Sequence, residues 1–259
     1  MLKPFLADLH IHTVLSACAE VEMIPPLITE RAQRLGLGLI AITDHNACYN
    51  AEAVMKAAAR TGLHVLPGME LQTVEEVHIL CLFDTLAQCQ KWQEEVSQKL
   101  PPLPNKEQIF GSQFVVDATG EWIRTEDRLL ATSTEMTLEE VATKVHRLGG
   151  MAIPAHVDRP SFSLFSNLGF LPDHLEVDAM EVTSRFVPEA GLRQWPELKA
   201  SCLIIGGDAH RLTEIQNRTL FKIASPAIEE ISRAFRGEQG RKVVVDWKKD
   251  GLLDGFPGL

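Results

Sequence analysis

Short apolar runs alternate with amphipathic stretches along most of the chain. The runs at residues 39–42 and 151–153 are continuous, which is typical of strands that are buried on both faces. Further strands are predicted at residues 7–13 (with the turn that follows), 64–66, 77–83, 179–182, 202–205 and 243–245. Helices are predicted between them at residues 25–35, 51–60, 86–99, 137–148 and 228–236. The order of these elements predicts an α/β fold of repeated strand–helix units.

The predicted helices carry start and stop signals. Pro25 and Pro26 stand where the first helix begins, and Gly36 follows its last apolar residue. Thr137 is followed three residues later by Glu140, which is the spacing of a capping box. These signals place the helix ends where the apolar pattern alone leaves them open.

The alternation is interrupted at about residues 100–135. Three prolines open this stretch. Residues 114–116 and 121–123 then predict two short strands joined by a turn at 117–120. We expect one domain over residues 1–259, with residues of about 100–135 as a small hairpin insertion beside the main fold.

Polar side chains with metal-binding chemistry follow the apolar part of several predicted strands, and His78 lies inside one. The residues at strand ends are His10, His12, Asp44, His45, Glu70, His156, Asp208 and His210. Because the strand ends of a β/α barrel meet at one face, we expect these side chains to surround one active site that binds metal. The other histidines, His64, His146 and His174, are interpreted as ordinary surface or core residues.

His10 and His12 are separated by one residue at the end of the first predicted strand. Side chains on a strand repeat with period 2, so both imidazoles are expected on the same side, where they can bind one metal ion. Asp8 has the same parity and is expected to orient them. An isolated pair of this kind is equally typical of an ordinary strand with two partly exposed histidines. The recurrence of the same chemistry further along the chain favours the metal site.

The composition narrows the class of protein. The 259 residues carry a formal net charge of -10 and no block rich in Lys and Arg, so no extended nucleic-acid surface is expected. A nucleotide in a metal-lined pocket stays compatible with this charge. No apolar run reaches the length of a membrane span and no signal-peptide pattern opens the chain, so we expect no membrane association. The five scattered cysteines favour a reducing, cytoplasmic location over a disulfide framework.

Five motifs, taken as a set, resemble those of the PHP superfamily of polymerase and histidinol phosphatase domains. They are Asp8-Leu9-His10-Ile11-His12-Thr13, Thr43-Asp44-His45, Gly68-Met69-Glu70, Ala155-His156 and Gly207-Asp208-Ala209-His210. They occur in order over nearly the whole chain. The resemblance implies a distorted (β/α)7 TIM-like barrel with two or three divalent metal ions (Zn, Mn or Fe). It also implies hydrolysis of phosphate esters, although some members are structural or regulatory parts of polymerases.

The resemblance further implies three metal sites. The ligands of the first would be His10, His12, Glu70 and Asp208. The second would share Glu70 as a bridge and add His78 and His156. The third would use His45 and His210, with one more ligand from the turn after the first strand.

The sequence departs from the family at that last ligand. PHP proteins usually have His or Asp in this turn, whereas this chain offers Cys18. A thiolate suits zinc or ferrous iron and is a poor ligand for magnesium. Glu20 and Glu22 are the competing ligands, and a small buried thiol with no ligand role is the other interpretation of Cys18.

The expected chemistry follows from these ligand types. A carboxylate such as Glu70 can bridge two cations, which can hold a hydroxide at neutral pH and clamp the phosphoryl oxygens that it attacks. Asp208 or a histidine near the third metal, such as His210, is expected to protonate the leaving oxygen.

Arginines near the cluster are candidates for holding the phosphate. Arg159 follows His156 by three residues, Arg185 follows the strand at 179–182, and Arg211 follows His210. Arg159 is the first choice for catalysis and substrate binding and Arg185 the second choice for binding, although each can instead form a surface ion pair. Asp158 could equally be the salt-bridge partner of Arg159.

The sequence therefore predicts a stand-alone metal-dependent phosphoesterase that acts on a small phosphate monoester or nucleotide by a metal-bound hydroxide. The alternatives are a non-catalytic metal-binding PHP module and an amidohydrolase-like metal hydrolase. The substrate, the native metal and the oligomeric state stay open.

Overall fold

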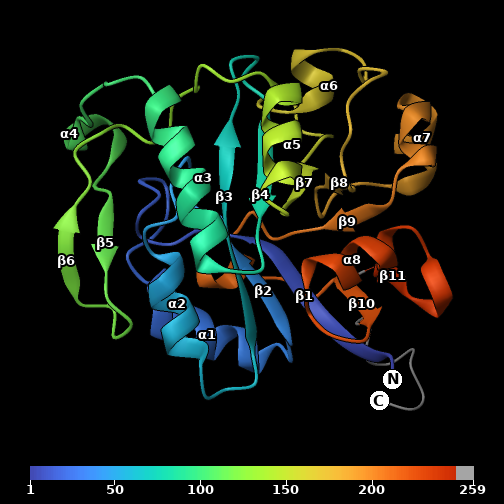
Figure 1. Cartoon of the computed structure of the whole chain (residues 1–259), viewed down its shortest axis with the longest axis horizontal. Coiled ribbons are helices and arrows are strands. Elements are labelled where there is room, and N and C mark those ends of the chain that lie inside the picture. Colours follow the sequence, from blue (N-terminus) through green and yellow to red (C-terminus); the bar gives the residue numbers. More distant parts are fainter. Residues whose placement is uncertain (249–259) are drawn as a thin grey trace.

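The computed structural model describes residues 1–248, and Figure 1 shows a curled sheet with helices packed against it. The main sheet has seven strands in the order β11-β10-β1-β2-β3-β4-β7. These strands are β1 (Lys3–Ile11), β2 (Leu39–Ile42), β3 (His64–Gln72), β4 (His78–Leu82), β7 (Met151–Pro154), β10 (Thr219–Ile223) and β11 (Lys242–Val245). A separate two-stranded sheet pairs β8 (Met180–Val182) with β9 (Leu203–Ile205).

The helices lie between these strands in the chain. They are α1 (Pro25–Arg34), α2 (Ala51–Ala58), α3 (Leu86–Lys99), α4 (Glu107–Phe110), α5 (Leu138–Arg147), α6 (Leu164–Asn167), α7 (Pro188–Gln194) and α8 (Ile228–Phe235). Three short 3-10 helices are Pro196–Ala200, Leu212–Glu214 and Glu238–Gly240. The predicted capping box of α5 is confirmed, because Thr137 and Glu140 exchange side-chain to backbone hydrogen bonds. No helix within residues 1–248 is long and apolar enough to cross a membrane.

The strand directions follow a distorted barrel. β1, β2 and β3 are parallel, whereas β4 runs antiparallel to both of its neighbours, and β10 runs antiparallel to β1. The prediction of an α/β fold is confirmed. β10 was not predicted from the sequence. It is a strand of five residues that follows an irregular segment, so no preceding helix marks it as part of a strand–helix unit.

Alternating residues of the strands build two apolar layers. On β2, Leu39 and Ala41 join the layer inside the curl, whereas Ile40 and Ile42 join the layer outside it. The outer layer packs against α1, α2, α3 and α5, and Figure 1 shows α3 and α5 lying over β3, β4 and β7. α8 supplies Ile231 to the inner layer. The polar ends of the strands are thereby held between two packed layers.

A β-bulge interrupts β1 at the residues that matter most for the site. The register between β1 and β2 shifts between Asp8 and Ile11. Leu9 belongs to the inner layer and Ile11 to the outer one, yet His10 contacts residues on the inner side. The extra residue of the bulge reverses the alternation, so that His10 and His12 face the interior and Asp8 does not.

The sheet is closed at one seam by a side chain. The amide of Ile205 in β9 donates to Oγ1 of Thr219, at 3.0 Å, and that hydroxyl donates to the carbonyl of Ile205, at 2.8 Å. Beyond β9, backbone bonds join Ala209 to His10 and His12. The segment that follows β9 is therefore fastened directly to the end of β1.

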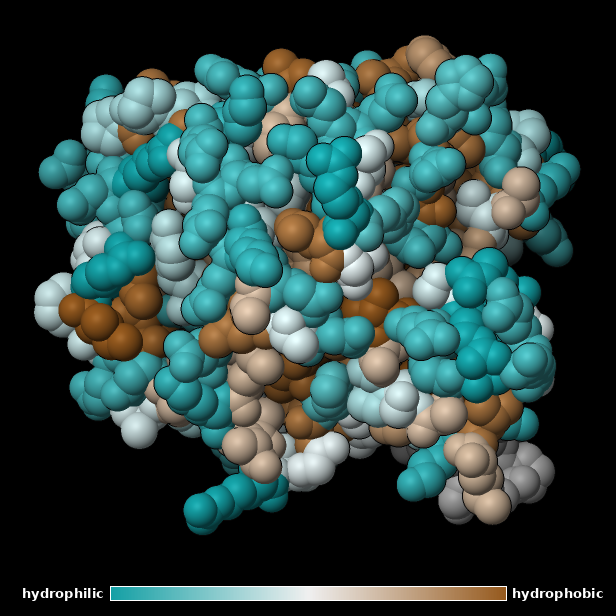
Figure 2. Space-filling model, in the orientation of Figure 1, coloured by the Kyte–Doolittle hydropathy of each residue, from teal (hydrophilic) through white to brown (hydrophobic). Residues whose placement is uncertain are grey.

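The predicted hairpin is confirmed as β5 (Phe114–Val116) and β6 (Trp122–Thr125). It buttresses the turn after β1, because the amide of Phe114 donates to the carbonyl of Val14. Figure 2 shows an apolar spot at the left edge of an otherwise largely hydrophilic face, over the place of this hairpin in Figure 1. The description of residues 100–135 as an insertion in a single domain stays a prediction, and the expected range of 1–259 extends beyond the described residues.

Candidate metal centre

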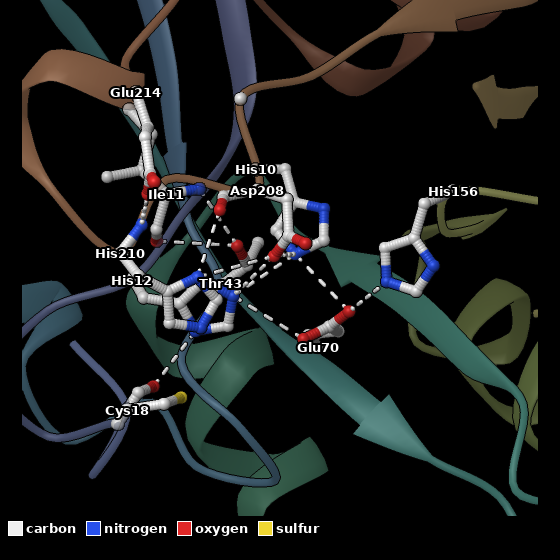
Figure 3. Close-up of polar contacts among 12 residues, drawn as sticks. His10, Ile11, His12, Cys18, Thr43, Glu70, His156, Asp208, His210 and Glu214 are labelled. Carbon is white, nitrogen blue, oxygen red and sulfur yellow. Dashed lines mark hydrogen bonds and ion pairs between the residues drawn. The ribbon is translucent and has the colours of Figure 1, made fainter. Parts of the chain in front are cut away.

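Four of the predicted ligands converge at the ends of β1, β3 and β9, and Figure 3 shows them pointing toward one another. Their ligand atoms all lie within 4.8 Å of one another, and the four residues are His10, His12, Glu70 and Asp208. Oδ1 of Asp208 lies 3.3 Å from Nε2 of His10 and 3.4 Å from Nε2 of His12. This group corresponds to the first site that the sequence implied.

Glu70 lies at the centre of the cluster. Its side chain is 1% exposed, and its two oxygens face five imidazoles at 2.7–3.4 Å. Those imidazoles belong to His10, His12, His45, His78 and His156. Burial alone would raise the pKa of Glu70, but the charges of His78 and His10 hold it well below its usual value. Glu70 therefore stays ionised and presents a full negative charge to this cavity.

The rings of His10 and His12 are held in the form that binds metals. Nδ1 of His10 donates to Oε2 of Glu181, at 2.9 Å. Nδ1 of His12 lies 2.9 Å from the hydroxyl of Ser16, which donates its own hydrogen to Asp44 and so accepts from the ring. Each ring then presents an unprotonated Nε2 to the cluster when neutral. Fixing the outer ring nitrogen in this way is the usual support of a metal-bound histidine.

The donor set fits divalent metal ions. Nε2 of His10 and Nε2 of His12 are 3.2 Å apart, and two acceptors this close are stabilised by a shared cation or a proton. Burial alone would lower the pKa of His10, but Glu181 and Glu70 raise it well above its usual value, so without a metal the cluster attracts protons. Imidazole and carboxylate together suit zinc, manganese and iron.

The second implied group comes together only in part. Glu70 and His78 form a group with His45, with ligand atoms within 4.8 Å, and His156 is not in that group. Nε2 of His156 nevertheless lies 3.0 Å from Oε1 of Glu70, the oxygen that Nδ1 of His78 contacts at 2.7 Å. Among the described residues, the outer ring nitrogens of His78 and His156 are buried with no hydrogen-bond partner.

The third implied group lies beside the first. His12, His45 and His210 present ligand atoms within 4.8 Å of one another. Sγ of Cys18 lies 3.4 Å from Nε2 of His45. Burial alone would raise the pKa of the Cys18 thiol, but hydrogen bonds from His210 and His45 lower it to about 5. Cys18 is itself exposed, at the edge of this group, and its thiolate form is favoured by these two histidines.

The competing carboxylates of this turn are engaged elsewhere or exposed. Oε1 of Glu20 accepts from the guanidinium of Arg211, at 2.6 Å. Arg211 is therefore tied to this turn, and Glu22 is exposed to solvent. Of the three side chains offered by the turn, that of Cys18 lies beside His45, whereas Glu20 contacts the cluster through its backbone amide, which donates to the carbonyl of His210 at 2.8 Å.

A pocket of about 390 Å³ opens beside the cluster, between the loops that follow β7, β8 and β9. Arg159 and Arg185 both line it. The guanidinium of Arg159 forms an ion pair with Oδ2 of Asp208. Asp158 instead accepts from the amide and hydroxyl of Thr183, so it is not the partner of Arg159. Arg159 thus reaches the cluster, and Arg185 lies at the pocket wall.

Two residues of the site adopt backbone conformations that non-glycine residues rarely adopt. His156 has φ 32° and Asp208 has φ 44°. Both stand where a strand ends and its loop must turn back over the cluster. Left-handed conformations of this kind cost about 1–3 kcal/mol each and are concentrated at functional sites.

Sequence reasoning placed the orienting carboxylate wrongly. Asp8 does not contact an imidazole; it accepts the backbone amides of His10, Gly207 and Gln216. Burial raises its pKa to about 7 despite these bonds. The carboxylate that orients His10 is Glu181 of β8. Glu181 is a charged residue within a predicted apolar strand, and that position was a signal in the sequence for a role at the site. No feature of the sequence marked the bulge that turns Asp8 away from the imidazoles.

The chain resembles known proteins over most of its length. The sequence profile of the PHP domain matches residues 8–170. The uncharacterized protein YqxK of Bacillus subtilis is 24% identical over 97% of this chain and 67% of its own length. The 5'-3' exoribonuclease Rnm of Salmonella typhimurium is 35% identical over 80 residues, which are 29% of this chain and 26% of that protein.

Solved structures share the fold. The lesion-specific endonuclease PfuEndoQ of Pyrococcus furiosus matches with a TM-score of 0.68 and 23% identity, over 93% of this chain. Endonuclease Q in complex with a 27-mer duplex that carries an abasic lesion matches with a TM-score of 0.66 and 22% identity. The chain spans 58% of the length of each. A protein of Bifidobacterium adolescentis that has been assigned as a metal-dependent phosphoesterase matches with a TM-score of 0.54 and 21% identity, over 79% of this chain and 87% of its own.

These structures correct one expectation. The absence of an extended nucleic-acid surface was inferred from the net charge of -10, yet structures that share the fold over 93% of the chain act on DNA. Net charge averages over the whole surface, whereas a substrate meets the local field of the pocket, where Arg159, Arg185 and the cluster lie.

The profile match covers more than half of the chain, and the curled α/β sheet agrees with the solved structures. The expected fold and the expected class, a metal-dependent hydrolase, agree with these matches. The chain belongs to the PHP domain family.

Proposed function

We propose that this protein is a metal-dependent phosphoesterase that hydrolyses the phosphate ester of a nucleotide, free or within a nucleic-acid strand. The observation that carries the proposal is the buried carboxylate of Glu70, which faces five imidazoles beside a pocket lined by two arginines. Divalent cations supply Lewis-acid activation of water and neutralise the charge of phosphoryl oxygens. The two implied sites that share Glu70 are the proposed place for them.

The residues around the cluster would bind and orient the substrate. Arg159 reaches across the pocket to Asp208, so its guanidinium is within reach of a phosphate at the cluster. Arg185 would hold the distal part of the substrate at the pocket wall. Nδ1 of His210 lies 2.9 Å from the carbonyl oxygen of Asp208. Burial alone would lower the pKa of His210, but its hydrogen bond with Cys18 raises it. His210 is the proposed group for passing a proton to the leaving oxygen. Burial alone would raise the pKa of Asp208, but the charge of His10 holds it well below its usual value, so Asp208 is proposed to act as an ionised ligand instead.

The test is hydrolysis by protein that has been stripped of metal with a chelator and then reloaded with Mn²⁺ or Zn²⁺. We expect the stripped protein to be inactive and the reloaded protein to release product from nucleoside monophosphates or short oligonucleotides. Asp208→Ala should abolish turnover while circular dichroism stays unchanged. No release from a broad panel of nucleotides, dinucleotides and oligonucleotides would favour a non-catalytic metal-binding module instead.

Cys18 is the proposed thiolate ligand of the third site, and it can be tested without an activity assay. Protein loaded with Co²⁺ should show the near-ultraviolet absorption of a thiolate bound to that metal. Cys18→Ser should lose this absorption while the other two sites stay occupied. Cys202→Ser removes a thiol outside the cluster and is the matched control. Unchanged absorption in Cys18→Ser would remove Cys18 from the ligands.

A further inference from the structure

An exposed aromatic ring lies against the metal cluster. Phe162, in the loop between β7 and α6, stacks on the imidazole of His78, with ring centroids 5.1 Å apart and planes at 23°. The residue is 40% exposed. One face of the phenyl ring is thus covered by a cluster histidine, and much of the ring still meets solvent.

The backbone conformation at this position does not explain why the residue is a phenylalanine. Phe162 has φ 54°, a conformation that is strained for a bulky residue and relaxed for glycine. Its carbonyl accepts the amide of His78 at 3.1 Å, a bond that glycine would make equally well. Because the ring is only partly buried, the free energy gained by its burial offsets only part of the cost of this backbone conformation. The ring itself is the feature that glycine would lack.

The same loop carries the phosphate-binding candidate. Arg159 stands three residues before Phe162, and the hydroxyl of Ser163 donates to the carbonyl of Arg159 at 2.6 Å. The loop is therefore fastened with the guanidinium toward Asp208 and the phenyl ring on His78. One loop thus brings both a cation and an aromatic ring to the residues of the cluster, where the phosphate of a ligand is proposed to lie.

We propose that Phe162 is a stacking platform for the nucleobase next to the phosphate at the cluster, and that it makes the site selective for nucleotides over phosphate esters without a base. The proposal rests on the proposed function and deepens it by naming what the site recognises besides phosphate. Stacking on an aromatic side chain is tolerant of base identity, so selectivity among the four bases is not expected from it.

Binding of hydrolysis-resistant ligands tests this without turnover. The probes are the methylene phosphonate analogues of deoxyadenosine 5'-phosphate and of 2-deoxyribose 5-phosphate, titrated by calorimetry into metal-loaded protein. We expect the native protein to bind the base-bearing probe roughly 10-fold or more tightly than the base-free one. Phe162→Gly should remove that preference and leave affinity for the base-free probe unchanged.

The matched control is Phe170→Gly, which removes a more exposed phenyl ring, 57% accessible, that has no recorded ring contact with a cluster histidine among the described residues. It should keep the full preference. Metal content and thermal midpoint are measured for each variant. A preference that persists in Phe162→Gly, or equal weakening of both probes with loss of metal, would overturn the proposal, because the ring would then be unused or would serve only to support His78. Should the native protein hydrolyse no ester yet show the predicted preference, the proposed function would fail and the platform would stand.

Discussion

Glu70→Ala is expected to lower the metal content of the purified protein by more than one ion per chain. The reason is geometric: both oxygens of this buried carboxylate face imidazoles of different implied sites. Without the carboxylate, the neutral imidazoles that remain would supply no negative charge to offset the charges of two cations. Hydrolysis should fall by more than about 100-fold, as expected when charge stabilisation of the transition state is removed. Elemental analysis measures the first effect directly.

Glu70→Gln is the companion variant, because it keeps the volume and one carbonyl oxygen while losing the charge. It should retain more metal than Glu70→Ala and less than the native protein. Glu75→Ala, which removes a carboxylate that accepts the amide of Leu138 outside the cluster, should leave the metal content unchanged. Native metal content in Glu70→Ala would show that the bridging role is wrongly assigned.

Asp44→Ala is expected to destabilise the metal-free protein by about 3 kcal/mol or more, because three buried donors lose their charged acceptor at about 1–3 kcal/mol each. Asp44 is buried and accepts three hydrogen bonds, from the amide and hydroxyl of Thr13 and from the hydroxyl of Ser16. Ser16 in turn holds His12. The loss therefore unfastens the turn after β1 as well as a ligand ring. Urea denaturation at neutral pH gives the free energy of unfolding.

Asp117→Ala provides a matched control for Asp44→Ala. Oδ1 of Asp117 also accepts three hydrogen bonds, from the amide and hydroxyl of Thr119 and the amide of Glu121, but it does so in an exposed turn. Water can replace those bonds, so a far smaller loss is expected. Equal losses in the two variants would mean that burial of the Asp44 network contributes little to stability.

Much of the fold and of the cluster was predictable, because both depend on periodic signals. Strands of continuous apolar residues, a capping box at Thr137 and polar residues at strand ends are local features, and the structure contains each of them. The gathering of His10, Glu70 and Asp208 follows from the rule that strand ends meet at one face of a barrel.

The remaining features depend on contacts between distant segments. The bulge in β1 breaks the period-2 rule, so Asp8 was expected beside an imidazole that Glu181 in fact orients. No local pattern marks a bulge without glycine. Phe162 was not singled out from the sequence, because its proposed role depends on the contact with His78, which stands 84 positions earlier in the chain. The expectation that a net charge of -10 excludes an extended nucleic-acid surface was wrong for a related reason, since a net charge does not say where the charged residues lie on the structure.

The side-chain seam at Thr219 gives the cluster a second consequence. β9 is joined to β10 there through one hydroxyl, and the segment after β9 carries Asp208 while β1 carries His10 and His12. A cation held between them would add a second tie between β1 and the segment after β9, beside the backbone hydrogen bonds of Ala209. Opening this edge of the barrel would then require release of the ion. Metal affinity and the rigidity of this edge would therefore rise and fall together.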